Sequence, residues 1–403
     1  MAKFQFKILK NNKNSGARAG LIKTKRGNIQ TPYLVTVATS ASVRALDSHD
    51  LISLGAQCTL ANTYHLHLRP GDERIRKLGG LHKFMNFDKP IFTDSGGFQA
   101  FSLGYGMEHN INKLGNIFAG PNKKGKTARE KKEKLARVDD NGVHFRSVYD
   151  GTKYFMDAKK SMKIQSNLGS DIIMAFDECT SPLSDYEYTR KALLRTHRWA
   201  AASLKYHDKK QALYGIVQGG WFKKLRTRSA EFINSLPFEG IAIGGSLGKS
   251  KKDMHKILEW VVPMLDKRPR HLLGIGDIDD LFECVSRGID TFDCVAPTRI
   301  ARRGNLYILP ESGGSLKNKF RINIKAAVHK DDKEAVDENC GCPTCRNYSR
   351  AYLRHLYRVN ELTYFRLASV HNIHFMLRLM ERIRKSILND SFDKLKRKWL
   401  KKK

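Results

Sequence analysis

The sequence has no apolar run near the roughly 20 residues that a membrane-spanning helix needs. It also lacks a secretory signal at its start, where residues 1–7 alternate apolar and polar side chains as a first strand would. Cysteine is scarce, and its seven residues are odd in number and mostly scattered, which is not typical of a disulfide framework. These features argue against a membrane protein and a secreted disulfide-rich domain, and we expect a cytoplasmic protein.

Acidic residues are few compared with basic ones. The 403 residues include 73 Lys and Arg against 40 Asp and Glu, and the formal net charge is +33. Such an excess suits a polyanionic partner, whose binding should weaken steeply as salt rises. A lysine-rich, solvated surface without a partner is the alternative interpretation.

One short segment, residues 291–302, contains both a carboxylate suited to catalysis and two of the basic residues. Asp293 ends an apolar run, and Arg299 and Arg302 follow three residues apart, just after a turn. A carboxylate suits attack on an electrophilic carbon or proton transfer. Arginines suit a polyanion or the edges of bases. The segment therefore indicates an enzyme that acts on a nucleic acid.

Eight short β-rich runs recur along the chain, most of them separated by stretches with helical periodicity. The predicted strands are residues 33–37, 58–62, 91–94, 171–177, 213–218, 240–244, 271–275 and 290–294. The predicted helices between them include residues 187–207, 221–236, 250–265 and 278–287. Alternating strands and helices imply parallel strands joined by right-handed crossovers. Eight such units favour a (β/α)₈ TIM barrel over an open doubly wound sheet.

Polar or glycine residues end six of the predicted strands. They are Asp94, Asp177, Gln218, Gly244-Gly245, Gly274-Ile275-Gly276 and Asp293. In a barrel these strand ends meet at one mouth, where active sites form. Ordinary strand-ending turns are the alternative explanation.

Two regions do not show the alternation of strands and helices that predicts the barrel. Residues 103–143 include the basic runs 123–126 and 129–134, which have almost no apolar side chains, and this predicts a basic, partly disordered insertion after the third strand. The barrel pattern ends after Leu306. We therefore predict a catalytic barrel over residues 1–306, and a zinc-binding, helical C-terminal region over residues 307–403 that packs on the barrel.

Three thiols lie close together at Cys340, Cys342 and Cys345. Clustered thiolates prefer zinc, and a closed tetrahedral site needs a fourth ligand. Among His355, His371 and His374, His371 is favoured because it opens an amphipathic stretch over residues 373–388. A site with no open position would be structural, with one Zn²⁺; a redox-active cysteine pair is the alternative.

The strand-end motifs form a set. Asp94-Ser95-Gly96-Gly97-Phe98-Gln99 offers a glycine pair that admits a planar ligand and an aromatic face for stacking. The set resembles the tRNA-guanine transglycosylase family in its bacterial form. The matching segments are residues 62–66, 69–71, 94–99, 142–147, 176–179, 217–220, 244–245, 292–295, 340–345 and 370–372. The resemblance extends from about residue 15 to residue 390, apart from the basic insertion.

The resemblance implies a (β/α)₈ barrel with a zinc-binding subdomain, and a base exchange on tRNA. In this family, guanine at the anticodon wobble position of tRNAs for Asn, Asp, His and Tyr is replaced by a 7-deazaguanine. Such chemistry requires the base to leave the stack, and a carboxylate at the sugar carbon. The family commonly acts as a homodimer.

The resemblance also implies roles for single residues. Asp293 would be the nucleophile that forms a covalent tRNA intermediate, and Asp94 the proton acceptor for the incoming base. The base-binding residues would be Asp94, Ser95, Gly96, Gly97, Phe98, Asp177, Gln218 and Gly245. The RNA-contacting residues would be Gly274, Ile275, Gly276, Asp277, Ile278, Asp279, Asp280, Thr298, Arg299, Ile300, Ala301 and Arg302. Taken alone, both acids could be helix N-caps.

One departure concerns the incoming base. Where many bacterial members carry valine and glutamate after the glycine pair, this chain has Gly248 and Ser250. Smaller, uncharged residues there would widen the pocket and weaken selection of an aminomethyl group. We expect preQ1 as the substrate, with queuine salvage as the second hypothesis. A non-catalytic tRNA-binding partner subunit is the third, although it would be expected to have lost its acids.

Overall fold

The computed structural model describes residues 4–99, 136–245 and 247–401. Eight parallel strands pair in one closed barrel, in the order β10-β11-β12-β13-β14-β4-β5-β6. Their bounds are β4 Tyr33–Ala38, β5 Thr59–Ala61, β6 Ile91–Thr93, β10 Ile172–Met174, β11 Ala212–Val217, β12 Gly240–Ile243, β13 Arg270–Leu272 and β14 Thr291–Asp293. The predicted TIM barrel is confirmed, and each predicted strand overlaps one barrel strand.

The chain divides into two compact units. The first unit comprises Met1–Leu60, Met85–Pro90 and Gly274–Lys403, and the second comprises Ala61–Phe84 and Ile91–Leu273. The predicted boundary between residues 306 and 307 falls inside β15 (Asn305–Tyr307), and the division into a barrel and a zinc-binding domain stays a prediction.

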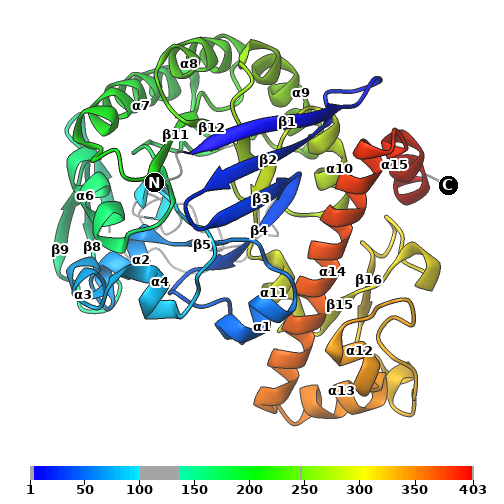
Figure 1. Cartoon of the computed structure of the whole chain (residues 1–403). Helices are drawn as coiled ribbons and strands as arrows, with labels where there is room; N and C mark the ends of the chain where they lie inside the picture. The colour runs from blue at the N-terminus through cyan, green and yellow to red at the C-terminus, as the bar shows by residue number, and fades with distance from the viewer. Residues whose placement is uncertain (1–3, 100–135, 246, 402–403) are drawn as a thin grey trace, which may run out of the picture. The chain divides into compact units, whose positions relative to one another are not determined.

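In the second unit, long helices alternate with the barrel strands (Figure 1). They are α6 Ala158–Leu168, α7 Tyr186–Tyr206, α8 Lys223–Ser235 and α9 Lys251–Val261, and the 3₁₀ turn η1 (Val262–Met264) extends the last. The strands β10, β11 and β12 are buried throughout, because helices cover one face and the barrel interior the other. Asp157, Asp185 and Ser250 begin three of these helices by accepting a hydrogen bond from the third backbone amide.

Short helices and strands occupy two stretches for which the sequence predicted no helix or strand. Helices α2 (Thr63–Leu68), α3 (Asp72–Lys77) and α4 (Gly80–Met85) lie between β5 and β6. An antiparallel sheet of β7 (Ala136–Val138), β8 (Val143–Arg146) and β9 (Lys153–Met156) precedes α6. Its first strand lies within the predicted basic insertion, most of which falls outside the described residues.

In the first unit, an antiparallel sheet precedes β4. It consists of β1 (Gln5–Asn11), β2 (Arg18–Thr24) and β3 (Gly27–Thr31), of which only the first was predicted. Later elements are α1 Ser48–Ser53, α10 Ile278–Ser286, α11 Ala296–Ala301, β15, η2 Pro310–Ser312, β16 Arg321–Asn323, η3 Ala327–His329, α12 Pro343–Asn347, α13 Arg350–Arg358, α14 Leu362–Leu388 and α15 Phe392–Leu400.

Helix α14 contacts β1, β2, β4, α11 and β15 within this unit (Figure 1). The amphipathic stretch noted in the sequence, residues 373–388, lies within this helix, which spans Leu362–Leu388. Ser369, His371 and Asn372 interrupt the apolar pattern, yet all three are fully buried, and His371 and Asn372 have polar partners. No described helix combines the length and the apolar composition that crossing a membrane requires.

Candidate active site and metal centre

Asp94 follows β6 directly, and the start of α2 holds its carboxylate. The backbone N–H of Thr63 donates to Oδ1 at 2.8 Å, and the Nδ2 amide of Asn62 donates to Oδ2. Asn62 is also the N-cap of α2, because its Oδ1 accepts from the backbone N–H of His65. Two donors thus fix the orientation of the acid. The motif containing Asn62 and Thr63 was noted in the sequence, but this role was missed.

Asp177, after β10, is the centre of a buried polar group. Its Oδ1 accepts from the Ser95 hydroxyl at 2.8 Å, and its Oδ2 accepts from Nε2 of Gln218 at 2.7 Å. Burial raises the pKa of Asp177 to about 6, although these two hydrogen bonds act in the opposite direction. The structure therefore brings together three of the predicted base-binding residues from the ends of three strands.

Glycine is required at two positions around this group. A Cβ atom on Gly97 would lie 2.6 Å from the carbonyl oxygen of Asp177. Gly245 has φ +77°, and a Cβ atom there would lie 2.0 Å from Oε1 of Gln218. The backbone therefore approaches the polar group as closely as a glycine allows. Within the described residues, Oε1 of Gln218 is buried and accepts no hydrogen bond.

Two further predicted base-binding residues lie beside them. Gly96 also has a left-handed backbone, with φ +79°. The Phe98 side chain is 52% exposed, so part of it is open to solvent.

Asp293 is the last residue of β14, where it pairs with Val35 of β4. Its Oδ1 accepts the backbone N–H of Gly274 at 3.0 Å. The next residue, Cys294, packs closely against Gly276. A Cβ atom on Gly276 would lie 2.4 Å from the Cβ atom of Cys294. Burial raises the pKa of the Cys294 thiol to about 12, so this thiol is not a nucleophile at neutral pH.

The predicted RNA-contacting arginines lie on α11 and at its end. Burial lowers the pKa of Arg302, and repulsion from Arg44, Arg299 and Arg303 lowers it further, which shows how closely these cations gather. The Thr298 and Ala301 side chains are buried, and Ile300 is half-buried. The positive charge of residues 298–302 is therefore carried by Arg299 and Arg302.

The other predicted RNA-contacting stretch, residues 274–280, leads into α10. Ile275, Ile278 and Asp280 are buried, whereas Asp277 pairs with Arg321 at 3.2 Å. The carboxylates of Asp277, Asp279 and Asp280 lie close together. The charged side chains of this stretch are therefore all negative.

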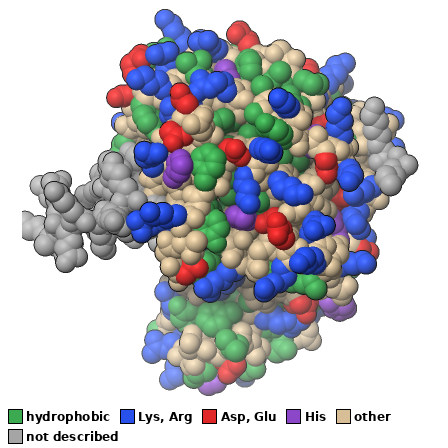
Figure 2. Space-filling view, turned by 90° about the vertical axis from the view of Figure 1, so that its left-hand side faces the viewer, with side chains coloured by type: hydrophobic (Ala, Val, Ile, Leu, Met, Phe, Trp, Pro, Cys, Tyr) green, Lys and Arg blue, Asp and Glu red, His purple; other side chains and the backbone are tan. Residues whose placement is uncertain are grey.

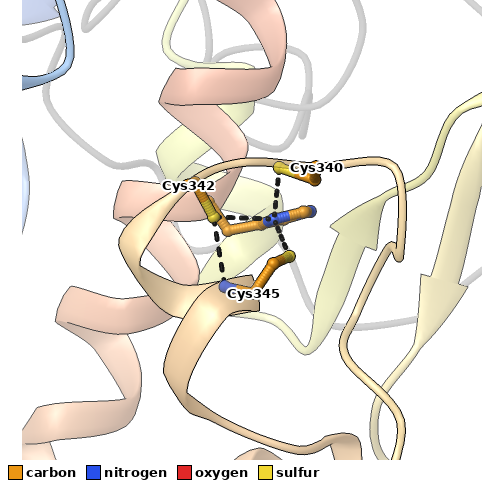
Figure 3. Close-up of side chains that lie close together, drawn as sticks. Cys340, Cys342 and Cys345 are labelled. Atoms are coloured by element: carbon orange, nitrogen blue, oxygen red, sulfur yellow. Dashed lines mark hydrogen bonds between the residues drawn. The ribbon is translucent and has the colours of Figure 1, made fainter.

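The three predicted cysteine ligands point toward one another (Figure 3). Nδ1 of His371 lies 3.8, 3.5 and 3.2 Å from the sulfurs of Cys340, Cys342 and Cys345. A tetrahedral zinc ion would place nitrogen and sulfur ligands about 3.6 Å apart. The donor set and its spacing therefore fit a metal ion.

The second ring nitrogen of His371 supports this orientation. Nε2 lies 2.7 Å from the carbonyl oxygen of Tyr307, which fixes Nε2 as the donor and leaves Nδ1 free to bind a metal. Nδ1 of His374 lies 3.5 Å from one sulfur, that of Cys340. The sequence missed Asp337, which is fully buried and accepts hydrogen bonds from Leu309, Ser312 and Asn339 beside the cysteine loop.

A family model described as queuine tRNA-ribosyltransferase matches residues 13–403. The chain belongs to this family. It is therefore an enzyme of the tRNA-guanine transglycosylase type, as the strand-end motifs predicted. A protein of Archaeoglobus fulgidus is 58% identical to it over 387 residues, which cover 95% of this chain and 96% of the relative.

Bacterial relatives match over a similar extent. The queuine tRNA-ribosyltransferase of Roseiflexus sp. (strain RS-1) is 43% identical and covers 98% of both chains. That of Bacillus velezensis is 43% identical, over 96% of this chain and 92% of its own. The family assignment therefore applies to the whole barrel and to the C-terminal region.

Proposed function

We propose that this enzyme exchanges guanine at wobble position 34 of tRNAs with GUN anticodons, those for Asn, Asp, His and Tyr. The incoming base is the 7-deazaguanine preQ1, and the reaction belongs to queuosine biosynthesis. Family membership supports the reaction type. The observation that carries the base specificity is the buried group of Asp177, Ser95 and Gln218.

This group suits the edge of a guanine-like base. Such an edge presents N–H donors beside a carbonyl acceptor. A carboxylate can accept from the donors, while the second N–H of the Gln218 amide and the backbone N–H of Gly245 can donate to the carbonyl. The exposed ring of Phe98 offers a stacking surface for the base.

The proposed chemistry has two displacement steps at C1′ of the ribose. A carboxylate oxygen of Asp293 attacks C1′, the bond to N9 of guanine breaks, and guanine leaves with the electron pair and takes up a proton from water at N9. The incoming base then gives a proton to Asp94, and its ring nitrogen attacks C1′ and releases Asp293. No phosphodiester is cut. The hydrogen bond from Gly274 to Asp293 supports a fixed orientation of the nucleophile.

Recognition of the anticodon loop falls to Arg299 and Arg302 in this proposal, with backbone contacts from residues 274–280. Lys and Arg side chains are spread over the face drawn in Figure 2, which suits long-range attraction of tRNA. Phosphate contacts would position the tRNA, and the arginines on α11 would read the bases beside position 34.

The incoming base could instead be queuine, because Gly248 and Ser250 replace two larger residues of the bacterial pattern. The structure offers a reason for Gly248 and for Ser250 that does not involve the incoming base. Gly248 has φ +86°, and a Cβ atom there would lie 2.3 Å from that of Asp253. Ser250 is the N-cap of α9, with its hydroxyl 3.2 Å from the N–H of Asp253. Local folding therefore accounts for these residues without a wider pocket, and we favour preQ1.

We also propose that the Cys₃His cluster holds one structural Zn²⁺. Thiolates and imidazole are the ligands that zinc prefers, and four protein ligands leave no open position for substrate. The cluster adjoins a hydrophobic core that includes Leu306, Ile308, Leu353 and Leu367. Zinc would therefore stabilise this core. A homodimer in the cytoplasm, as is common in the family, completes the proposal.

The test is exchange of radiolabelled guanine into a defined tRNA, with preQ1 and queuine as competing bases. We expect exchange in tRNAs with GUN anticodons and a higher efficiency for preQ1. A higher efficiency for queuine would replace preQ1 by queuine in the proposal. Absence of exchange despite tight tRNA binding would favour a non-catalytic partner subunit instead.

A further inference from the structure

Arg226 lies in the first turns of α8 and is fully buried. Burial lowers its pKa to about 10, so the guanidinium still carries its charge at neutral pH. A buried charge is costly unless hydrogen bonds compensate for the lost water. The role of this arginine must therefore be sought in what its N–H groups contact.

The guanidinium joins the ends of two neighbouring barrel strands. Its Nε donates to the carbonyl oxygen of Gly220 at 2.8 Å. Its Nη1 donates to the carbonyl oxygens of Val217, which ends β11, and Gly244, which follows β12, both at 2.9 Å. Gly219 permits this approach, because a Cβ atom there would lie 2.8 Å from the backbone nitrogen of Arg226.

The hydrogen bond from Arg226 to the Gly244 carbonyl determines the direction in which the Gly245 N–H points. The Gly244 carbonyl and the Gly245 N–H belong to one planar peptide group, in which a trans bond makes them point in opposite directions. Arg226 draws the carbonyl toward α8, so the N–H must point away from Arg226. A charged donor on the carbonyl also polarises the peptide and strengthens the N–H as a donor.

We propose that Arg226 is a positioning residue for base recognition, which orients and polarises the Gly244–Gly245 peptide so that the Gly245 N–H meets the carbonyl of the base. This inference rests on the proposed function, in which that N–H binds the base. Ser229, on the same face of α8, supports the other side of the site, since its hydroxyl accepts the Gln218 backbone N–H at 3.0 Å.

The test compares two arginine-to-lysine substitutions. Arg226→Lys keeps the charge but cannot bridge three carbonyls with a planar fork. Arg268→Lys is the matched control, because Arg268 also donates to backbone carbonyls, those of Leu236 and Phe238, but before β12 begins. Should Arg226→Lys fail to fold, Arg226→Gln carries the same test, because its amide keeps two N–H donors without the charge.

The readout is the equilibrium binding of free guanine and of 6-thioguanine, which keeps the N–H edge but replaces the carbonyl oxygen by a weaker acceptor. We expect Arg226→Lys to weaken guanine binding about 10-fold and 6-thioguanine binding much less. We expect Arg268→Lys to change neither. Equal weakening for both ligands would reduce Arg226 to a structural role, and unchanged guanine binding would also overturn the inference.

Exchange into tRNA by the unsubstituted enzyme separates this inference from the proposed function. If that enzyme exchanges guanine while Arg226→Lys binds both bases as the unsubstituted enzyme does, only the role of Arg226 is wrong. If the unsubstituted enzyme neither exchanges nor binds guanine, the proposed function itself fails.

Discussion

At the scale of single residues, Asp177 shows a conflict between folding and recognition. In the proposed function Asp177 accepts N–H groups of a base, for which the ionised carboxylate is the better acceptor, yet burial favours the protonated form. Ser95 and Gln218 reduce this cost with one hydrogen bond each. The residual cost should be measurable as a pH-dependent loss of stability.

Replacing Asp177 by Asn should therefore stabilise the protein at neutral pH. Because the folded pKa of about 6 lies above the unfolded value, the folded state binds more protons between about pH 4 and pH 6, and stability falls as pH rises through that window. We expect the free energy of unfolding of D177N, relative to the unsubstituted protein, to rise by about 2 kcal/mol from pH 4 to pH 7. Urea unfolding across this range measures it.

Asp72 is the control for this experiment. Although burial raises its pKa, hydrogen bonds from His67 and Asn167 lower it below its ordinary value. Stability from Asp72 is therefore present at neutral pH and lost in acid, so D72N should show the opposite trend. Parallel curves for both variants would contradict the assignment of the raised pKa to Asp177.

Replacing Asp293 by Asn should remove the proposed nucleophile and keep the fold. The amide can still accept the Gly274 N–H, so we expect tRNA binding and thermal stability to stay near those of the unsubstituted enzyme. Guanine exchange should fall by about 10³-fold or more, because no comparable nucleophile replaces the carboxylate. Exchange assays with labelled guanine measure this, and undiminished exchange would exclude the covalent mechanism.

At the scale of elements, the turn before α9 determines which substitutions are tolerated near Gly245. Gly248 has a left-handed backbone and lies against Asp253, whose Oδ2 accepts the N–H of Lys249 at 2.8 Å. Ser250 caps the helix that follows. Larger side chains here would disturb the start of α9 before they changed the base pocket.

Substituting Gly248 by Ala should consequently destabilise the protein by about 3 kcal/mol, through backbone strain and overlap with Asp253. Gly151 is the matched control, with φ +76° and no atom within 4 Å of an added Cβ. Gly151→Ala should cost about 1 kcal/mol from backbone strain alone. Chemical denaturation of both variants decides the matter, and equal costs would show that the contact with Asp253 yields without strain.

The metal centre offers a test between two neighbouring histidines. His371→Ala should abolish zinc binding and destabilise the C-terminal core by about 3 kcal/mol or more, because metal binding is coupled to folding. His374→Ala should keep the zinc, since its ring approaches only the sulfur of Cys340. Metal analysis and hydrogen exchange over α12 to α14 distinguish the outcomes. Retention of zinc by the His371 variant would refute the ligand assignment.

The sequence was most informative where local pattern and burial agree. Strand β11 is buried from Ala212 to Val217, and runs of this kind predicted the barrel. The polar residues that follow the strands were predicted to meet, and Asp177 and Gln218 do share a hydrogen bond, whereas their binding of a base stays a prediction. The part of helix α14 before residue 373 was not predicted, and polar residues that are paired in the core, such as His371 and Asn372, interrupt its apolar pattern. The roles of Asn62 and Arg226 depend on contacts distant in sequence, with Asp94 and Gly244, which no local pattern encodes.

At the scale of the whole molecule, the net charge of +33 should dominate tRNA binding. Basic side chains that contact phosphates release counterions, so affinity depends on salt. We expect the tRNA dissociation constant to rise on the order of 10³-fold between 50 and 200 mM salt. Filter binding over this range measures the slope. A nearly flat response would mean that the basic surface does not contact the RNA.

The number of residues in helix α14 is constrained, because side chains at separate points along it make contacts that depend on their spacing. His371 lies at the metal cluster, Asn372 holds the carbonyls of Pro297 and Asn305, and Arg384 donates to those of Gly20 and Thr31. His371 and Arg384 are about 20 Å apart along the helix axis. Removing one residue between them would turn Arg384 by about 100°. An insertion or deletion between these two residues would therefore break one of the two sets of contacts, even where every side chain that makes them is kept.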